Sequence, residues 1–331
     1  RTPHLDELSR DGLRFTDHYA NGSICSPTRA AFLTGRYQQR LGLDNALYYQ
    51  EMNRGLDPSA RTLADALTDA GYVTGLSGKW HVGYDLERRP LQQGFTHFFG
   101  LLGGNHHYFK HMDRIGVHDL WAGNDPVHRE GYTTDLISRN AIQFIRENND
   151  RPFFLFIAHA APHFPWQGPD DRDKLVEPKS KAWQKGDRST YVAMVERMDT
   201  AIGNTLAELD RQGLCDRTLV VFCSDNGGHT HSSNAPLSGE KATLWEGGIR
   251  VPCIARWPEV LAAGSTTSHP CMTMDWTATI RRAARCPADS DGEDGIDLLP
   301  YLTGERKTES RPMFWRRKSG PVRKVKNASR A

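Results

Sequence analysis

Cys25 begins a segment that predicts a helix with a chemically active N-terminus. Residues 25–29 read CSPTR; Pro27 suits the first turn of a helix, and Gly35 can end it. The unpaired backbone N–H groups and the dipole of such an N-terminus favour an anion, and Arg29 lies one turn further on, within reach of the same place. A buried structural cysteine before an ordinary surface helix is the alternative.

Lys79 and His81 form a second candidate group. Residues 78–81 read GKWH and follow a short strand predicted at residues 72–76. A P-loop would need Gly at position 73 and Ser or Thr at position 80, and a nucleophile elbow would need Gly at position 79, so neither motif is present. A solvated surface lysine and an ordinary loop histidine are the alternatives.

Two further groups follow strands of their own. His163, between two prolines, comes after the apolar residues 153–158, and His159 is a nearby rival. Asp225 and Asn226 end an apolar run at residues 219–223 and offer oxygen ligands suited to a hard cation such as calcium or magnesium. Without other evidence, an Asp-Asn-Gly sequence after a strand is more often a turn.

The elements between these groups alternate between helix and buried strand. Apolar residues recur at helical spacing in residues 62–70, 134–149 and 188–211, and each of these segments leads into an apolar run of strand length. Residues 153–158 are apolar on both faces, which predicts a strand covered on both sides. The pattern predicts an α/β fold with a mainly parallel central sheet flanked by helices, with its chemistry beyond the carboxyl ends of the strands.

The motifs together resemble the type I, formylglycine-dependent sulfatases of the alkaline phosphatase superfamily. The family's C-x-P-x-R signature matches residues 25–29, and the match continues through AAFLTG at residues 30–35. Its other segments resemble GKWH at 78–81, APH at 161–163, DNG at 225–227, and SGEK at 238–241 with WEGGIRVP at 245–252. The matches occur in family order from Thr2 to about Gly304, and the sequence is similar to arylsulfatases and N-acetylgalactosamine-6-sulfatases.

The resemblance implies a cofactor and a role for each residue. A separate formylglycine-generating enzyme would oxidise Cys25, and one hydroxyl of the hydrated aldehyde would attack sulfur, polarised by calcium, or else magnesium, at Asp225 and Asn226. Lys79, Lys241 and Arg29 would hold the sulfate oxygens and the diol. His163 would protonate the departing alcohol, since imidazole titrates near pH ~6.5, and His81 would serve the diol.

The resemblance also predicts missing parts. Family members begin with a strand ending in an Asp pair that supplies the remaining metal carboxylates, and we expect that strand upstream of Arg1. Residues 311–316 resemble the entry to a small C-terminal antiparallel sheet. We therefore expect a catalytic domain at residues 1–304 and the start of a truncated subdomain at residues 305–331.

Composition excludes several classes of partner. The 331 residues carry 42 basic and 40 acidic side chains, and a net charge of +2 gives no general reason to expect nucleic acid or a membrane surface as partner. The six cysteines include no C-x-x-C pair, which disfavours a zinc site or a disulfide framework. The family resemblance implies a periplasmic, extracellular or lysosomal enzyme.

Two other functions stay open. A phosphomonoester or phosphonate hydrolase could use the same fold, although phosphate's extra charge normally asks for more metal. A non-catalytic carbohydrate-binding relative would be expected to lose Cys25, Lys79 or Lys241, and the sequence keeps all three. Residues 94–109 are rich in aromatic and imidazole side chains and suggest a sugar-facing loop; a zinc pair of His107 and His111 is a less favoured alternative.

Overall fold

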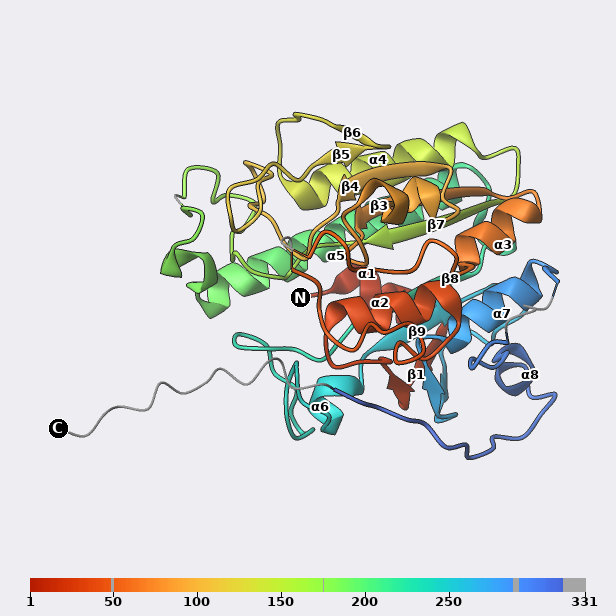
Figure 1. Ribbon diagram of the computed structural model, residues 1–331. Coiled ribbons are helices and arrows are strands. Elements are labelled where there is room, and N and C mark those ends of the chain that lie inside the picture. Colours follow the sequence, from red (N-terminus) through yellow and green to blue (C-terminus); the bar gives the residue numbers. More distant parts are fainter. Residues whose placement is uncertain (49–50, 175, 288–291, 318–331) are drawn as a thin grey trace.

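Strand β3 (Val73–Lys79) lies inside a five-stranded sheet of the order β6-β5-β4-β3-β7. It pairs in parallel with β4 (His97–Leu101) on one side and with β7 (Phe153–Ala158) on the other. Two short antiparallel strands, β5 (Trp121–Ala122) and β6 (Asp125–Pro126), extend the sheet beyond β4. The computed structural model, shown in Figure 1, describes residues 1–48, 51–174, 176–287 and 292–317.

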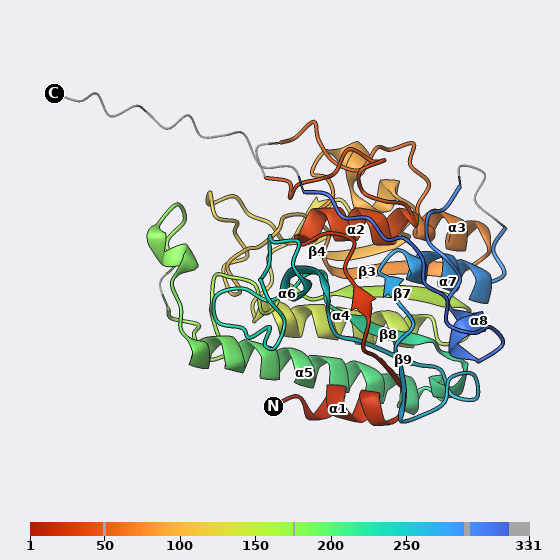
Figure 2. The ribbon, with the colours of Figure 1, turned by 90° about the horizontal axis from the view of Figure 1, so that it is seen from below.

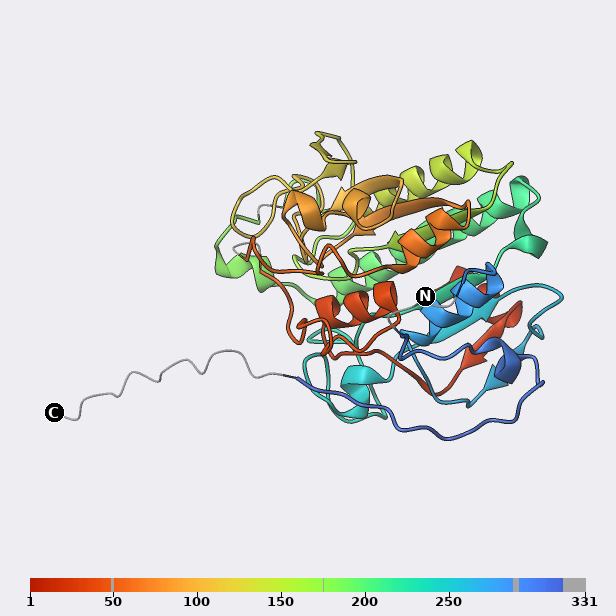
Figure 3. The same cartoon turned by 45° about the vertical axis from the view of Figure 1, so that its right-hand side comes forward.

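A second sheet has the order β10-β1-β9-β8. Its strands are β1 (Leu13–Phe15), β8 (Val220–Cys223), β9 (Cys253–Arg256) and β10 (Ser265–Thr267). Strand β1 is parallel to β10 and antiparallel to β9, and β8 is antiparallel to β9. A short parallel pair, β2 (His18–Tyr19) with β11 (Cys271–Met272), accompanies it. In Figure 3 the first sheet occupies the upper half of the molecule and the second sheet the lower half.

Helices cover both faces of these sheets. In Figure 2 one layer contains α2 (Cys25–Thr34), α3 (Leu63–Asp69) and α7 (Asp275–Ala283). The opposite layer contains α1 (Pro3–Arg10), α4 (Thr133–Glu147) and α5 (Arg188–Arg211). The short helices α6 (Glu246–Ile249) and α8 (Leu299–Leu302) and the 3₁₀ turns η1 (Leu86–Arg88), η2 (Pro90–Gln92), η3 (Lys181–Gln184) and η4 (Cys215–Arg217) lie in the connections. The α/β architecture predicted from the sequence is thereby confirmed, with mixed rather than mainly parallel sheets.

Local sequence signals account for several helix ends. Thr62 and Asp65 form a capping box at the start of α3, in which each side chain bonds the other's backbone N–H. The Asp187 side chain accepts a hydrogen bond from the Thr190 N–H and caps α5. Gly35 ends α2 in the left-handed conformation, with φ of 68°.

The burial of the apolar strands differs from the prediction. Strand β7 ends the first sheet and β8 ends the second, so each has one edge without a hydrogen-bonded strand among the described residues. Most of β7 and all of β8 are only half-buried, although residues 153–158 predict a strand covered on both sides. The apolar composition of β7 and β8 suits central strands, but in the described part of the chain both are edge strands.

Residues 305–317 cross the surface of the catalytic region in an irregular conformation. The Arg316 guanidinium donates two hydrogen bonds to Asp44, at 3.0 and 2.9 Å, and the Trp315 indole N–H donates to the Ala20 carbonyl at 2.9 Å. The separate subdomain expected from residue 305 stays a prediction, and residues 318–331 lie outside the described part of the chain. None of the described helices has the length and apolar character needed to cross a membrane.

Candidate active site

Cys25 is the first residue of α2, and its side chain is buried. Ile24 before it is extended, so the helix begins at the cysteine as the sequence predicts. The Thr28 hydroxyl accepts from the Gly22 N–H at 3.0 Å and donates to the Gly22 carbonyl at 2.9 Å. The loop before Cys25 is thereby fastened to the first turn of its own helix.

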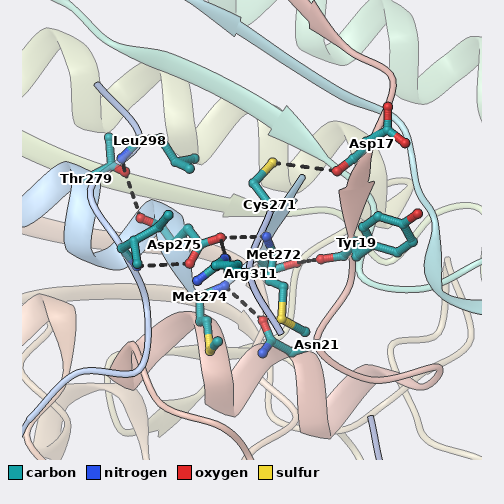
Figure 4. A network of polar contacts seen from close by, with 12 residues as sticks. Asp17, Tyr19, Asn21, Cys271, Met272, Met274, Asp275, Thr279, Leu298 and Arg311 are labelled. Carbon is teal, nitrogen blue, oxygen red and sulfur yellow. Dashed lines mark hydrogen bonds and ion pairs between the residues drawn. The ribbon is translucent and has the colours of Figure 1, made fainter. Parts of the chain in front are cut away.

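A polar network fixes the same loop from the other side (Figure 4). The Asn21 side-chain oxygen accepts a hydrogen bond from the Met274 N–H at 2.8 Å. The next residue, Asp275, has a fully buried carboxylate that bonds the backbone N–H of Met272 at 2.6 Å and forms an ion pair with Arg311. Residues more than 250 positions apart therefore hold the approach to the nucleophile.

Arg29 links α2 to two strand ends. Its Nη1 donates to the Lys79 carbonyl at 2.7 Å, at the end of β3, and its Nε and Nη2 both donate to Oδ2 of Asp225, just after β8. The guanidinium is buried, and these three contacts hold it in a fixed position between the two strand ends. Arg29 thus joins the three predicted groups around Cys25, Lys79 and Asp225.

Trp80 anchors the segment between the two candidate residues of the GKWH motif. Its ring is 1% exposed and stands edge-on to Phe95, with centroids 6.0 Å apart. Its indole N–H donates to the Arg88 carbonyl at 2.9 Å. A buried, hydrogen-bonded tryptophan leaves Lys79 and His81 little freedom to move, which suits residues that must meet a reacting group.

The electrostatics at Cys25 are those of an anion site. Burial by itself would raise the pKa of the thiol, but the positive charges of Lys241 and Lys79 outweigh burial and bring the pKa well below its ordinary value. Burial lowers the pKa of Lys79, while the neighbouring Cys25 raises it. Lys241 comes from a different loop, which is tied to the Cys25 loop because the Ala242 N–H donates to the Ser23 carbonyl at 2.8 Å.

His81 has a defined tautomer. Its Nε2 lies 2.9 Å from the Leu47 carbonyl, which can only accept, so Nε2 carries the proton. Nδ1 is then a buried acceptor, and it has no hydrogen-bond partner among the described residues. The backbone of His81 is left-handed, with φ of 60°, and a Cβ at Gly104 would lie 2.5 Å from the imidazole ring. Such local strain occurs typically at functional positions.

His163 is the predicted proton donor, and its environment changes that expectation. Burial, Lys241 and Lys79 bring the pKa of His163 well below its ordinary value, although Asp225 acts in the opposite direction. Its Nδ1 lies 2.8 Å from the Phe164 carbonyl and therefore carries the hydrogen. The shift favours the neutral imidazole in the free protein, so the ordinary value near pH 6.5 does not apply. The influence of both lysines nevertheless places His163, rather than His159, beside the candidate site.

Asp225 and Asn226 fit part of a cation site. Oδ1 of Asn226 is buried without a hydrogen-bond partner among the described residues, as expected of an oxygen meant for a cation. Both Arg29 contacts to Asp225 use Oδ2, and although burial opposes ionisation, the positive charges of Arg29, Lys79 and Lys241 bring the pKa of this carboxyl far below its usual range. Within the described residues, however, no three His, Cys, Asp or Glu side chains gather to hold a metal.

The structure corrects one further sequence interpretation. In residues 94–109 the side chains of Phe95, Phe98, His106, His107 and Tyr108 are buried, so most of the segment belongs to the core and does not face a sugar. His107 accepts hydrogen bonds from the N–H groups of Phe109 and Lys110 at 3.2 and 3.0 Å, which argues against the alternative zinc pair with His111.

Sequence reasoning missed the residues that only position others. Neither the Leu47 carbonyl, which sets the tautomer of His81, nor the buried Asp275 lies in a recognisable motif. The one available signal for Asp275 was its place in the amphipathic helix α7. If such a helix buries an Asp, that Asp needs a partner, because Asp is rarely fully buried unless it is paired.

Comparison with known proteins agrees with this geometry. The family model described as Sulfatase matches residues 1–285. The chain belongs to the sulfatase family. This family generally implies a formylglycine and a divalent metal.

Individual sulfatases resemble the chain over most of its length. Steryl-sulfatase of Mus musculus is 31% identical over 92% of this chain, and N-acetylgalactosamine-6-sulfatase of Canis lupus familiaris is 32% identical over 96% of it. The chain spans 61% and 64% of the lengths of these two relatives. The solved structure of Ps i-CgsB in complex with k-i-k-neocarrahexaose superposes with a TM-score of 0.88 at 31% identity, covering 96% of this chain and 74% of that one.

Proposed function

We propose that the protein hydrolyses sulfate esters at Cys25 after this residue has been converted to formylglycine. One observation carries the proposal: Lys79 at the end of β3 and Lys241 in a loop act on the buried Cys25, and although burial opposes them they bring the pKa of its thiol well below normal. The two cations stabilise a negative charge at position 25 inside the protein. Such a position suits a nucleophile that must take up and then release a sulfate.

The absent groups would supply the nucleophile and part of the positive charge. Hydrated formylglycine provides a hydroxyl that can attack sulfur and a second that can expel sulfate, and a divalent cation at Asp225 and Asn226 provides a Lewis acid. We propose calcium for this cation, with magnesium as the alternative, because the two side chains offer only oxygen ligands.

The residues of the chain divide the remaining work. Lys79 and Lys241 bind the sulfate oxygens and stabilise the charge that develops on them. Arg29 orients the Asp225 carboxylate through its two contacts to Oδ2. The acceptor Nδ1 of His81 is suited to take a hydrogen bond from a hydroxyl at position 25.

His163 would supply the leaving-group proton only after substrate binds. Burial and the two lysines lower its pKa in the free protein, and a bound sulfate anion would offset the charge of the lysines. The pKa of His163 would then rise, and a proton could pass to the departing alcohol. Proton uptake on substrate binding is the measurable sign of this step.

We propose a sulfated carbohydrate as the substrate class. Two large aromatic side chains are exposed close in sequence to site residues: Tyr48, next to Leu47, and Trp245, four residues after Lys241. Exposed aromatic faces this close in sequence to Leu47 and Lys241 suit the binding of a sugar ring. The similarity to Ps i-CgsB, whose structure contains neocarrahexaose, supports the same class.

Two measurements test the proposal. After coexpression with a formylglycine-generating enzyme, peptide mass spectrometry should find an aldehyde at position 25, and an unmodified thiol under conditions that convert a control substrate would contradict it. The matured protein should then hydrolyse an aryl sulfate and a sulfated saccharide faster than the matching phosphate monoesters. A preference for phosphate esters would favour the phosphohydrolase alternative. A periplasmic, extracellular or lysosomal location remains our expectation for the natural enzyme.

A further inference from the structure

An open groove runs between α4 and α5, in the layer opposite α2 (Figure 2). It encloses about 250 Å³, and its lining is mostly polar or charged. The lining side chains that matter here are Asp135, Ser138 and Arg139 from α4 with Arg197, Asn204 and Arg211 from α5. None of these residues belongs to the site around Cys25.

The groove starts at the same edge of the sheet as the candidate active site. The two helices run parallel, because Arg197 in the middle of α5 contacts Asp135 near the N-terminus of α4, and Arg146 contacts Glu208 near the C-termini of both helices. The short connection from α4 to β7 places the N-terminus of α4 at the edge where β7 ends, and the parallel strand β3 ends there with Lys79. A chain leaving the active site over this edge could therefore continue along the groove.

The groove and its continuation carry more positive than negative charge. Four guanidinium groups, of Arg139, Arg146, Arg197 and Arg211, line the seam with two carboxylates. Glu208 is buried and receives hydrogen bonds from Arg146 and Arg211, and the pKa of its carboxyl falls to about 2, chiefly through the bond from Arg146. Asp135 pairs with Arg197, on which Asp170 also acts, so four cations against three anions leave an excess of one positive charge.

Two arginines retain donors for a ligand. Within the described residues Arg139 makes no ion pair, and its side chain is exposed at the centre of the α4 face. Arg197 donates to Asp135 through Nε and Nη2, at 2.6 and 2.7 Å, so Nη1 remains. The exposed Asn204 amide stands on the opposite wall. Forked guanidinium donors match the geometry of oxyanions such as sulfate groups.

We propose that the α4–α5 groove is a second, non-catalytic binding site for the anionic groups of an extended sulfated oligosaccharide, with Arg139 and Arg197 as its anchors. This inference rests on the proposed function, because it assigns the groove to the polymer whose sulfate ester reacts at position 25. When one segment of an oligosaccharide binds in the groove, the local concentration of its other segment at position 25 rises. Long substrates therefore gain affinity that short ones lack.

The test uses Arg139→Glu, with Arg282→Glu as matched control. Arg282 is an exposed arginine on α7, in the opposite helix layer. Binding of a sulfated hexasaccharide is measured by calorimetry in a Cys25→Ala background, which prevents turnover. We expect Arg139→Glu to weaken binding about tenfold at low salt, the loss of one charged contact, and Arg139→Lys to restore most of it. Arg282→Glu should bind like its parent.

Activity provides the second readout, in matured protein with Cys25 intact. Arg139→Glu should lower kcat/KM for the hexasaccharide through KM and leave kcat/KM for a small aryl sulfate unchanged. Equal losses in Arg139→Glu and Arg282→Glu would overturn the proposal, as would no loss in Arg139→Glu or no hexasaccharide binding by the parent. Hexasaccharide binding that depends on Arg139, in a protein that turns over no sulfate ester, would uphold the groove and refute the proposed function.

Discussion

The Arg29 guanidinium contacts one oxygen of Asp225 twice, with Nε and Nη2 at 3.2 and 3.0 Å from Oδ2. The same side chain reaches the Lys79 carbonyl through Nη1, so a single residue on α2 joins the ends of β3 and β8. Because both contacts share Oδ2, Oδ1 keeps its lone pairs for a cation. Arg29 therefore orients a candidate metal ligand, and in the proposed function it would also place a positive charge near the sulfate.

We expect Arg29→Ala to lower both turnover and stability. Removing a hydrogen bond to a charged, partly buried carboxylate should cost about 1–3 kcal/mol of the free energy of unfolding at pH 7. Asp225 has a depressed pKa, so its contribution to stability is present above the unfolded value of about 3.9 and is lost as pH falls below it. The stability difference between wild type and Arg29→Ala should therefore shrink as pH is lowered towards 3.

Denaturant unfolding at several pH values measures this difference. Arg29→Lys keeps the charge without the fork and should fall between wild type and alanine, while Arg282→Ala on the exposed face of α7 should unfold like wild type. A difference that stays constant with pH would mean that Arg29 stabilises the fold without acting on Asp225.

In the unmatured protein, Cys25 should be the thiolate at neutral pH. Burial raises the pKa of each of the other five thiols, to about 11 in Cys215 and about 12 in Cys223, whereas the charges around Cys25 lower its pKa. A thiolate persists above its pKa, so the ultraviolet signal should vanish only as pH falls well below the ~8.5 of a free cysteine.

Two variants locate the source of that signal. Cys25→Ser should remove the thiolate absorbance at pH 7, and Lys79→Ala should move its midpoint to higher pH because one nearby cation is lost. An unchanged midpoint in Lys79→Ala, with the fold intact by circular dichroism, would separate Lys79 from the anion site.

Lys79→Ala and Lys241→Ala should each reduce kcat of the matured enzyme at least ~10²-fold, the usual loss when one preorganised charge aimed at the transition state is removed. Both lysines act on Cys25 and on His163, so the two losses should not add in the double variant. Steady-state kinetics on an aryl sulfate, with thermal unfolding as the check on folding, makes the measurement. Wild-type kcat in either variant would show that its role is misplaced.

Local signals allowed much of the fold and site to be predicted from the sequence. Helix α5 begins and ends where its apolar spacing indicates, Gly35 ends α2, and the motifs at His163 and Asp225 follow strands in the predicted way. Lys79 differs, because it is the last residue of β3 (Val73–Lys79) and does not follow a strand at residues 72–76. The tautomer of His81 and the neutral state of His163 could not be predicted, since they depend on a carbonyl and on charges from distant segments. The half-burial of β7 depends on its neighbours in space, which periodicity does not show.

The last prediction concerns the metal. Calcium takes six to eight oxygen ligands, and among the described residues no three His, Cys, Asp or Glu side chains gather around Asp225 and Asn226 to hold it. We therefore expect the 331-residue chain to bind calcium weakly in calorimetric titration.

Two variants test whether the weak binding occurs at the candidate position, where Oδ1 of Asn226 is buried without a hydrogen-bond partner among the described residues and Arg29 uses only Oδ2 of Asp225. Asp225→Asn and Asn226→Ala should each weaken calcium binding further, because each removes an oxygen or a charge offered to the cation, while Arg282→Ala should not. Tight stoichiometric binding by the 331-residue chain, unaffected by Asp225→Asn, would mean that other residues build the metal site.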